Sequence, residues 1–178
     1  MTMVNSISNR LGREFFTRDV LVVAPELPGK IMLVKDKSGI IRRYMITEVE
    51  AYRGEEDLAC HASKGRTSRT EIMYSEGGHL YIYLIYGVYW MLNIVTGEPG
   101  NPQAILIRGL DGIRGPGRIT RDLGIDSSWY GIDIVRSEII YLENSNADIL
   151  LNTSPRIGID YSGEPWKSKP WRYFAAET

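Results

Sequence analysis

The sequence is poor in the residues that build disulfide frameworks and metal centres. Among its 178 residues it has one cysteine, Cys60, and two histidines, His61 and His79. A single cysteine cannot form a disulfide within the chain, and this usage is typical of a reducing compartment. The same scarcity argues against a structural zinc site, and no spacing of acidic residues and histidines indicates another metal. We therefore expect no metal and no cofactor.

Long apolar runs are absent as well. The longest have the length of single strands, so no segment is expected to span a membrane. The N-terminal stretch also lacks the apolar region of a secretory signal. We expect a cytoplasmic protein, associated with the nucleoid if its source is prokaryotic. A chain of 178 residues can bury a core of its own, and we expect one domain over 1–178 and a monomer.

Neither sign of charge is in excess, but the charged residues are unevenly distributed along the chain. A formal net charge of -1 argues by itself against a nucleic-acid-binding protein. However, basic residues recur in three loops rich in Gly, Pro and Ser, at 64–69, 114–121 and 167–172. Each loop alone is more simply a solvated surface, whereas the three together favour a face that follows phosphates. The candidate phosphate-binding residues are Lys64, Arg66, Arg69 and Arg118.

Alternating apolar and polar residues predict many short strands. Two hydrophobic runs meet at Tyr86-Gly87 and predict a hairpin. Other strands are expected over 29–35, 41–52, 103–108 and 132–143, with one more in the C-terminal tail. Short helices are expected over 17–26 with Thr17 as its cap, from a capping box at Ser68 and Glu71, and over 115–123. The pattern predicts an α+β fold with a curved antiparallel β-sheet and short surrounding helices.

The strand over 41–52 places carboxylates beside tyrosines. Regular alternation puts one set of residues on one face, namely Tyr44, Ile46, Glu48, Glu50 and Tyr52, and the residues between them on the other. A carboxylate on a strand most often belongs to an exposed polar face. The alternative is a general base that orients and deprotonates a water molecule. Strand phase alone does not decide between these two interpretations.

The predicted hairpin is crowded with tyrosines, at positions 81, 83, 86 and 89. An aromatic core face explains some of them. Tyr86 differs, because a residue at a hairpin tip has little core to join. A rigid aromatic side chain there is suited to enter a base stack. An extruded base would then be held by stacking on aromatic rings and by hydrogen bonds to its edge.

Seven stretches, in this order, resemble the alkyladenine DNA glycosylase family, also called 3-methyladenine DNA glycosylases of the methylpurine type. They are RLGREFF, LPGKIMLV, ITEVEAYRGEEDLACHASKGRTSRTEIMY, GGHLYIYLIYGVYWMLNIV, AILIRGL, GPGRIT and SPRIGIDYSGEPWKSKPWRY. Together they span nearly the whole chain. The block at 47–108 is specific, because it places a Glu, a Tyr, a His, two further Tyr, an Asn and an Arg at family-like spacing.

The resemblance implies roles for individual residues. It makes Glu50 the general base that activates water, with Arg108 and the backbone carbonyl of Ile157 as further contacts of that water. The flipped base would lie between three walls and a floor, formed by Tyr52, His61, Tyr83 and Asn93. Asn93 would crowd the exocyclic amino group that guanine carries and adenine lacks. Tyr86 would fill the gap left in the duplex, with Val88 beside it.

The implied partner is double-stranded DNA that contains damaged purines. N-alkylation makes a purine cationic and a better leaving group, and electron-rich aromatic faces favour a cationic base. A carboxylate at the sugar would stabilise the oxocarbenium-like transition state and deliver water. No lysine lies near the motif to form a Schiff base, which favours a monofunctional hydrolase over a lyase.

Two other functions stay open. The first is a damaged-DNA-binding protein with weak catalysis. Intact Glu50 and Arg108 argue against it, whereas a chain that stops at Thr178 argues mildly for it, because relatives usually add a further segment that could support Ile157. The second is an RNA-binding module, for which Tyr86 and Asn93 have no evident use. Two smaller departures from the family pattern are RGLDG after Arg108, which predicts a more mobile loop, and Pro25 in the first helix.

Overall fold

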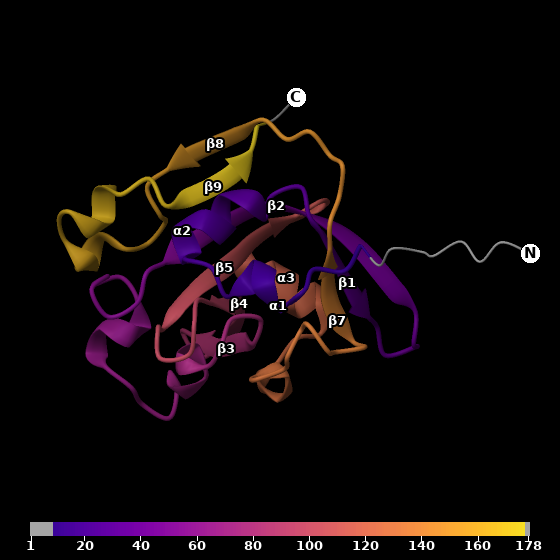
Figure 1. Ribbon diagram of the computed structural model, residues 1–178, viewed down its shortest axis with the longest axis horizontal. Helices are drawn as coiled ribbons and strands as arrows, with labels where there is room; N and C mark the ends of the chain where they lie inside the picture. The colour runs from indigo at the N-terminus through magenta and orange to yellow at the C-terminus, as the bar shows by residue number, and fades with distance from the viewer. Residues whose placement is uncertain (1–8, 177–178) are drawn as a thin grey trace, which may run out of the picture.

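The computed structural model describes residues 9–176 and shows, within them, nine strands of one curled antiparallel sheet with short helices around it (Figure 1). The main strand order is β3-β4-β5-β2-β1-β7, with β6 beside β5 and with β9 between β2 and β8. The strands are β1 Ile31–Lys35, β2 Ile41–Tyr52, β3 Leu80–Ile85, β4 Tyr89–Thr96, β5 Gln103–Leu110, β6 Ile113–Arg114, β7 Ile140–Glu143, β8 Leu151–Ser154 and β9 Arg172–Ala175. The predicted α+β class and the antiparallel sheet are confirmed.

Strand β2 is shared by two parts of the sheet. Its first half, 41–45, pairs with β1, and its second half, 46–52, pairs with β5 on one side and with β9 on the other. The register with β5 shifts on both sides of Glu48, which marks a β-bulge. Gly109 on β5 lies opposite, and a Cβ there would be 2.7 Å from the Thr47 hydroxyl oxygen. A glycine therefore lets the two backbones approach at the bulge.

The bulge corrects one predicted face of this strand. Regular alternation places Ile46 on the same side as Glu48 and Glu50. Instead, Ile46 is buried in the main core together with Val49 and Ala51. A bulge adds one residue to a strand and so changes the side that the following residues face. Glu48 and Glu50 still share a side, and both approach the same arginine there.

The helices are short and lie around the sheet. They are α1 Arg13–Phe16, α2 Val20–Val23 and α3 Pro116–Leu123, with 3-10 helices η1 Ala24–Glu26, η2 His61–Lys64, η3 Glu71–Tyr74, η4 Ser127–Trp129, η5 Asp160–Ser162 and η6 Trp166–Ser168. The helix predicted over 17–26 is α2 followed by η1, and its predicted cap is wrong. The Asp19 carboxylate, not Thr17, accepts the backbone N–H of Leu21. Pro25 is tolerated because it lies in the first turn of η1.

The capping box predicted at Ser68 and Glu71 does not form. Helix η3 begins after Thr70, whose hydroxyl accepts the backbone N–H of Thr67 at 2.9 Å. The Glu71 carboxylate cannot reach back to a cap, because it accepts two hydrogen bonds from Arg66 at 2.6 and 2.8 Å. An ion pair between side chains has therefore replaced the local hydrogen bonds that the spacing indicated.

Two predictions over 115–143 have different outcomes. The helix over 115–123 is confirmed as α3, and it ends at Gly124, which has the left-handed φ of 67° that a glycine cap favours. The strand over 132–143 forms only at its end, as β7. Its first part is a turn, in which the Asp133 carboxylate accepts the backbone N–H of Val135 at 3.0 Å.

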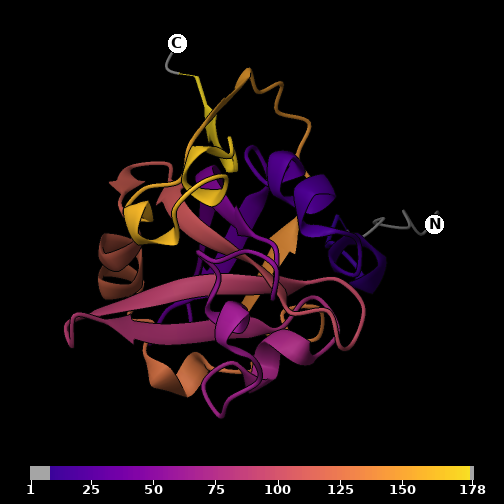
Figure 2. The same ribbon diagram turned by 90° about the vertical axis from the view of Figure 1, so that its left-hand side faces the viewer.

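The β3–β4 hairpin extends away from the body of the molecule (Figure 2). Its turn has positive φ at both central residues, 53° at Tyr86 and 64° at Gly87, and the N–H of Val88 bonds to the carbonyl of Ile85 at 3.1 Å. Such turns match the twist of paired strands. The hairpin and its turn at Tyr86-Gly87 are therefore as the sequence predicts. No helix in the described part of the chain is long and apolar enough to cross a bilayer.

Candidate active site

A cavity of about 410 Å³ opens beside the hairpin, between the end of β2 and the loop at 157–161. A cavity of this size accommodates a small aromatic molecule such as a nucleobase. Seven of the site residues predicted from the sequence line it: Tyr52, His61, Tyr83, Tyr86, Asn93, Arg108 and Ile157. Glu50 and Val88 are not among the lining residues, although Glu50 is hydrogen-bonded to two of them, Tyr52 and Ile157. The fold thus brings together residues from separate segments of the chain.

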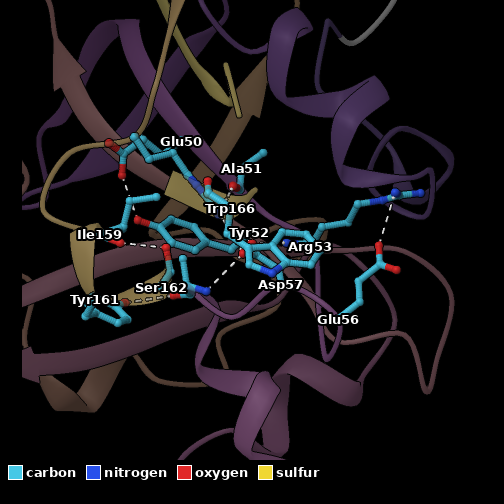
Figure 3. Close-up of polar contacts among 12 residues, drawn as sticks. Glu50, Ala51, Tyr52, Arg53, Glu56, Asp57, Ile159, Tyr161, Ser162 and Trp166 are labelled. Atoms are coloured by element: carbon cyan, nitrogen blue, oxygen red, sulfur yellow. Dashed lines mark hydrogen bonds and ion pairs between the residues drawn. The ribbon is translucent and has the colours of Figure 1, made fainter. Parts of the chain in front are cut away.

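Glu50 is fully buried on β2 and is surrounded by hydrogen-bond donors. Its Oε2 accepts the hydroxyl of Tyr52 at 2.8 Å, and the two side chains lie side by side in Figure 3. Its Oε1 accepts the backbone N–H of Ile157 at 2.7 Å and lies 3.5 Å from Nε of Arg108. Ile157 therefore contacts the carboxylate through its N–H, in addition to any role of its carbonyl. Three neighbours fix the direction of the Glu50 carboxylate.

Burial and these partners have opposite effects on the pKa of Glu50. Burial raises this pKa above the ordinary value of 4.5, whereas Arg108, the Ile157 N–H and the Tyr52 hydroxyl lower it. Burial, followed by the charge of Glu50, raises the pKa of Tyr52 well above its ordinary range. Tyr52 therefore stays protonated and donates. A desolvated carboxylate with a raised pKa is a stronger base than one in water, which is what general-base chemistry needs.

Arg108 is held by a second carboxylate, that of Glu48. Oε1 of Glu48 accepts hydrogen bonds from Nε of Arg108 at 3.1 Å and from Nε of Arg172 at 2.6 Å. Arg172 comes from β9, which pairs with β2 at this point. Glu48 is thus engaged by two guanidinium groups. The geometry makes it a residue that positions Arg108, whereas Glu50 has the position of a base.

A buried ion pair next to the site was not predicted from the sequence. Arg156 and Asp57 both have fully buried side chains and are joined by two hydrogen bonds, at 2.5 and 2.9 Å. The Arg156 guanidinium lies over the rings of Tyr52 and Trp171, 4.8 and 5.0 Å from their centroids. It thereby supports Tyr52 from behind and fixes the backbone just before Ile157. The residue types were visible, but a contact across 99 positions leaves no local signal.

Two aromatic rings form the wall around η2 and β3. The ring of His61 meets that of Tyr83 edge to face, with centroids 4.6 Å apart. Nδ1 of His61 is 2.8 Å from the hydroxyl of Tyr81, which also lines the cavity. Burial, followed by the charges of Arg69 and Lys64, lowers the pKa of His61 to about 4. His61 is therefore a neutral imidazole at physiological pH.

Asn93 is buried in the floor of the cavity, on β4. Its amide nitrogen donates to the backbone carbonyls of Tyr81 at 3.1 Å and Met91 at 3.4 Å. These two bonds fix the orientation of the amide, so that it presents an inflexible polar group to any base that enters.

Comparison with known proteins gives one consistent result. The model of the family "Methylpurine-DNA glycosylase (MPG)" matches residues 14–113 and 111–178. A relative from Desulfitobacterium hafniense is 39% identical, over 95% of this chain and 96% of its own. Relatives from Legionella pneumophila and Rickettsia felis are each 40% identical, over 93% and 94% of this chain and 93% of their own. All three are named "Putative 3-methyladenine DNA glycosylase". The chain belongs to the methylpurine-DNA glycosylase family.

Tyr86, at the tip of the hairpin, is the most exposed aromatic residue in the described part of the chain. The side chain of Tyr86 is 86% exposed and that of Val88 66% exposed. Tyr86 also has the positive φ that non-glycine residues seldom adopt. The tip therefore presents two neighbouring apolar side chains to solvent.

The four candidate phosphate-binding residues are at the surface, but their surroundings differ. Arg66 is bound to Glu71 by two hydrogen bonds, and Nε of Arg118 lies 3.5 Å from Asp122. Arg69 lies over the ring of Tyr83, 5.1 Å from its centroid. Lys64 has no carboxylate within ion-pair distance among residues 9–176. No group of three potential metal ligands occurs within those residues.

Proposed function

We propose that this protein is a monofunctional DNA glycosylase. It hydrolyses the N-glycosidic bond of alkylated or deaminated purines in double-stranded DNA after the damaged nucleotide has been flipped out, as the first step of base excision repair. The substrates are 3-methyladenine, 7-methylguanine, hypoxanthine and 1,N6-ethenoadenine. The protein acts as a monomer in the cytoplasm or at the nucleoid.

One observation supports this proposal above the others, namely a buried carboxylate at the edge of an aromatic cavity. The Glu50 carboxylate is oriented by Tyr52 and Ile157, which also line that cavity. A base bound between Tyr52 and the His61–Tyr83 wall brings its sugar towards this carboxylate. The charge that develops on the sugar as the base departs is then stabilised by a fixed anion in a low-dielectric site.

Water activation follows from the same geometry. A carboxylate oxygen has two acceptor positions, and Tyr52 uses one of those on Oε2. The other is available to a water molecule aimed at C1′ of the sugar. Arg108 lines the cavity next to Glu50 and assists in holding this water. Proton transfer to Glu50 accompanies attack on the sugar, and the base leaves with the bonding electrons.

Flipping and selection are assigned to the hairpin and the cavity floor. Tyr86 enters the duplex and occupies the space of the extruded nucleotide, and Val88 packs beside it. The inflexible amide of Asn93 crowds the amino group at C2 of guanine, so normal guanine is disfavoured; 7-methylguanine carries the same amino group but is released because its cationic base is a better leaving group. No lysine is among the residues that line the cavity in the described part of the chain, in line with a hydrolase that forms no Schiff base.

The decisive experiment is excision under single-turnover conditions. Duplexes that each contain one of the four lesions are mixed with excess protein, and released base and abasic sites are quantified. Release of at least one lesion base, with strand breaks appearing only after alkali, is expected. An undamaged duplex is the control. Tight binding of lesion duplexes without release would instead favour a damaged-DNA-binding protein, and preference for RNA would favour an RNA-binding module.

A further inference from the structure

Arg172 is one of the basic residues that the charge pattern placed in a loop that follows phosphates, at 167–172. In the structure it is the first residue of β9, and its side chain is 22% exposed. Its Nε donates to Oε1 of Glu48 at 2.6 Å, and its Nη1 donates to the hydroxyl of Ser154 at 3.0 Å. The guanidinium also lies over the ring of Phe174, 4.5 Å from its centroid. Three neighbours therefore hold Arg172, and a phosphate would have to displace them.

Arg172 is separated from the aromatic cavity by Glu48. Glu48 and Arg172 line a second cavity, of about 800 Å³, whereas Arg108 lines the aromatic one. Oε1 of Glu48 is the acceptor that the two guanidinium groups share, because it also accepts Nε of Arg108 at 3.1 Å. Arg172 is thus connected to the candidate active site through one carboxylate oxygen.

The single hydrogen on Nε of Arg108 lies between two carboxylates. Nε is 3.1 Å from Oε1 of Glu48 and 3.5 Å from Oε1 of Glu50. One N–H cannot bond both oxygens at full strength, so the more attractive carboxylate draws the guanidinium towards itself. Arg172 forms the shorter bond to Glu48 and offsets its charge. Glu48 therefore attracts Arg108 less than it would alone, and Arg108 stays within reach of Glu50.

We propose that Arg172 is a positioning residue of the active site, which acts through Glu48 to keep the Arg108 guanidinium beside the catalytic carboxylate. The inference deepens the proposed function and rests on it, because that carboxylate and Arg108 are the groups that hold the attacking water. It also moves Arg172 from the predicted phosphate-following face to the support of the chemistry. Without Arg172, the undivided charge of Glu48 draws Arg108 away from Glu50.

The expected consequence is a change in the titration of Glu50. Burial raises its pKa, and Arg108 is the largest of the influences that lower it. A weaker contact with Arg108 therefore raises this pKa further, and the acid limb of excision moves to higher pH. The other ionisable groups nearby keep their charge in this range. Arg156 stays a cation, and burial lowers the pKa of His61 to about 4. Burial also raises the pKa of three neighbouring tyrosines, which stay neutral: Tyr52, Tyr83 and Tyr161.

The test is a double-mutant cycle with two readouts. Arg172→Gln, Glu48→Gln and the double variant are compared with the wild type. The first readout is the acid limb of single-turnover excision. The second is the pH titration of the Glu50 carboxyl group by NMR, with isotopically labelled glutamate and with Glu50→Gln to assign the signal, and it requires no substrate. The matched control is Arg43→Gln, because Arg43 lies near the other end of β2 and forms an ion pair with Glu143 at 2.9 Å.

Arg172→Gln is expected to raise the midpoints of both titrations by about 0.5–1 pH unit. It should lower excision at neutral pH by about tenfold, with little change in affinity for lesion duplexes. In the Glu48→Gln background the same substitution should leave the midpoints where they are, because the connecting charge is gone. Arg172→Lys should restore most of the wild-type midpoint, and Arg43→Gln should not move it. Ser154→Ala removes only one partner of Arg172 and should give a smaller shift in the same direction. It carries the test if thermal denaturation shows that Arg172→Gln does not fold.

An equal shift by Arg172→Gln with and without Glu48 would overturn the inference, because Arg172 would then act on Glu50 directly. Unchanged midpoints, with weaker binding to all duplexes and a smaller salt dependence, would return Arg172 to the phosphate-following face. Both results are separate from failure of the proposed function. If the wild type releases none of the four lesions, the proposed function is wrong, and the NMR titration alone decides whether Arg172 acts through Glu48.

Discussion

The buried end of β2 and the tip of the β3–β4 hairpin lie in opposite environments, one closed to solvent and the other open to it. At the end of β2, Glu50 is fully buried and has partners on both oxygens. At the tip, Tyr86 is 86% exposed and has no core around it. Under the proposed function, the group that does chemistry has to be held still, whereas the group that enters DNA has to be presented to it. Substitutions in the first region should therefore affect both catalysis and folding stability. Substitutions in the second should affect only the binding and excision of DNA.

The largest expected effect is that of Glu50→Gln. The amide keeps the shape of the side chain but can neither accept a proton nor stabilise the sugar cation. Single-turnover excision is expected to fall by about 10²–10⁴-fold or more, while affinity for lesion duplexes stays close to that of the wild type. Excision within threefold of the wild type, with binding retained, would show that Glu50 is not the base. Glu48→Gln would then be the variant to measure.

Next in size is the effect of Asp57→Ala on folding. It leaves the fully buried guanidinium of Arg156 without its anion, which typically lowers the free energy of unfolding by about 3–5 kcal/mol. Chemical denaturation measures this. The matched control is Glu56→Ala, one position away, because Glu56 forms only an exposed ion pair with Arg53 at 3.2 Å (Figure 3). Its effect should stay below about 1 kcal/mol. Equal effects of the two variants on the free energy of unfolding would show that the buried ion pair does not stabilise the fold.

The pH dependence of excision and of stability tests the role of Glu50 in the buried region. Because burial raises the pKa of Glu50, the acid limb of single-turnover excision should lie above the ordinary glutamate value of 4.5. For the same reason Glu50 favours folding only in its protonated form, and it becomes a cost as pH rises through its folded-state pKa. Glu50→Gln should therefore be at least as stable as the wild type at neutral pH, and this advantage should shrink on acidification.

His61 provides the control for that profile. Its pKa of about 4 keeps it neutral above pH 5, so its protonation contributes nothing between pH 5 and 8. His61→Gln should lower the rate but leave the position of the acid limb unchanged. A limb that moves or vanishes in His61→Gln would assign the titration to the histidine.

A smaller and more selective effect is expected at the hairpin. Tyr86→Ser should change the free energy of unfolding by no more than about 0.5 kcal/mol, since surface positions seldom contribute more. Excision from fully paired duplexes should nevertheless fall, by more than excision from mismatched or single-stranded substrates, in which extrusion costs less. If the variant unfolds instead, or if all substrates are affected alike, Tyr86 is not a wedge.

The smallest predicted effect concerns Arg118, which the sequence placed in a basic loop and the structure places on helix α3. Reversing the charge at Arg118 should weaken binding to all duplexes by a similar factor. It should also reduce the slope of log affinity against log salt by about 0.9 for each phosphate that the arginine no longer neutralises. Titrations from low to physiological salt give this slope. An unchanged slope would place Arg118 outside the DNA interface.

The sequence predicted those features whose signals are local. The turn at Tyr86-Gly87 and the end of α3 at Gly124 depend on backbone preferences of adjacent residues, and both are confirmed. The bulge beside Glu48 was missed, because it depends on the fit between β2 and Gly109 of another strand. The Ser68 cap was wrong because the Arg66–Glu71 pair competes with it.

The candidate site shows the same division between local and distant signals. The family resemblance, not a local signal, placed Tyr52, His61 and Tyr83 around one base, and the structure shows all three lining one cavity. It gave no indication of the pair between Asp57 and Arg156, which are 99 positions apart. Electrostatic surroundings such as the Arg156 guanidinium over the Tyr52 ring also arise only when distant segments meet.

The hydrogen bond from Ile157 to Glu50 joins residues 107 positions apart, and it has a consequence for how the protein matures. Contacts that close such long loops form late, after the local hairpins. The loop that carries Ile157 supplies one hydrogen bond to the Glu50 carboxylate. Before this loop is in place, the carboxylate is hydrated and its orientation is not fixed. We expect the ability to cut glycosidic bonds to appear only once this long-range contact has formed.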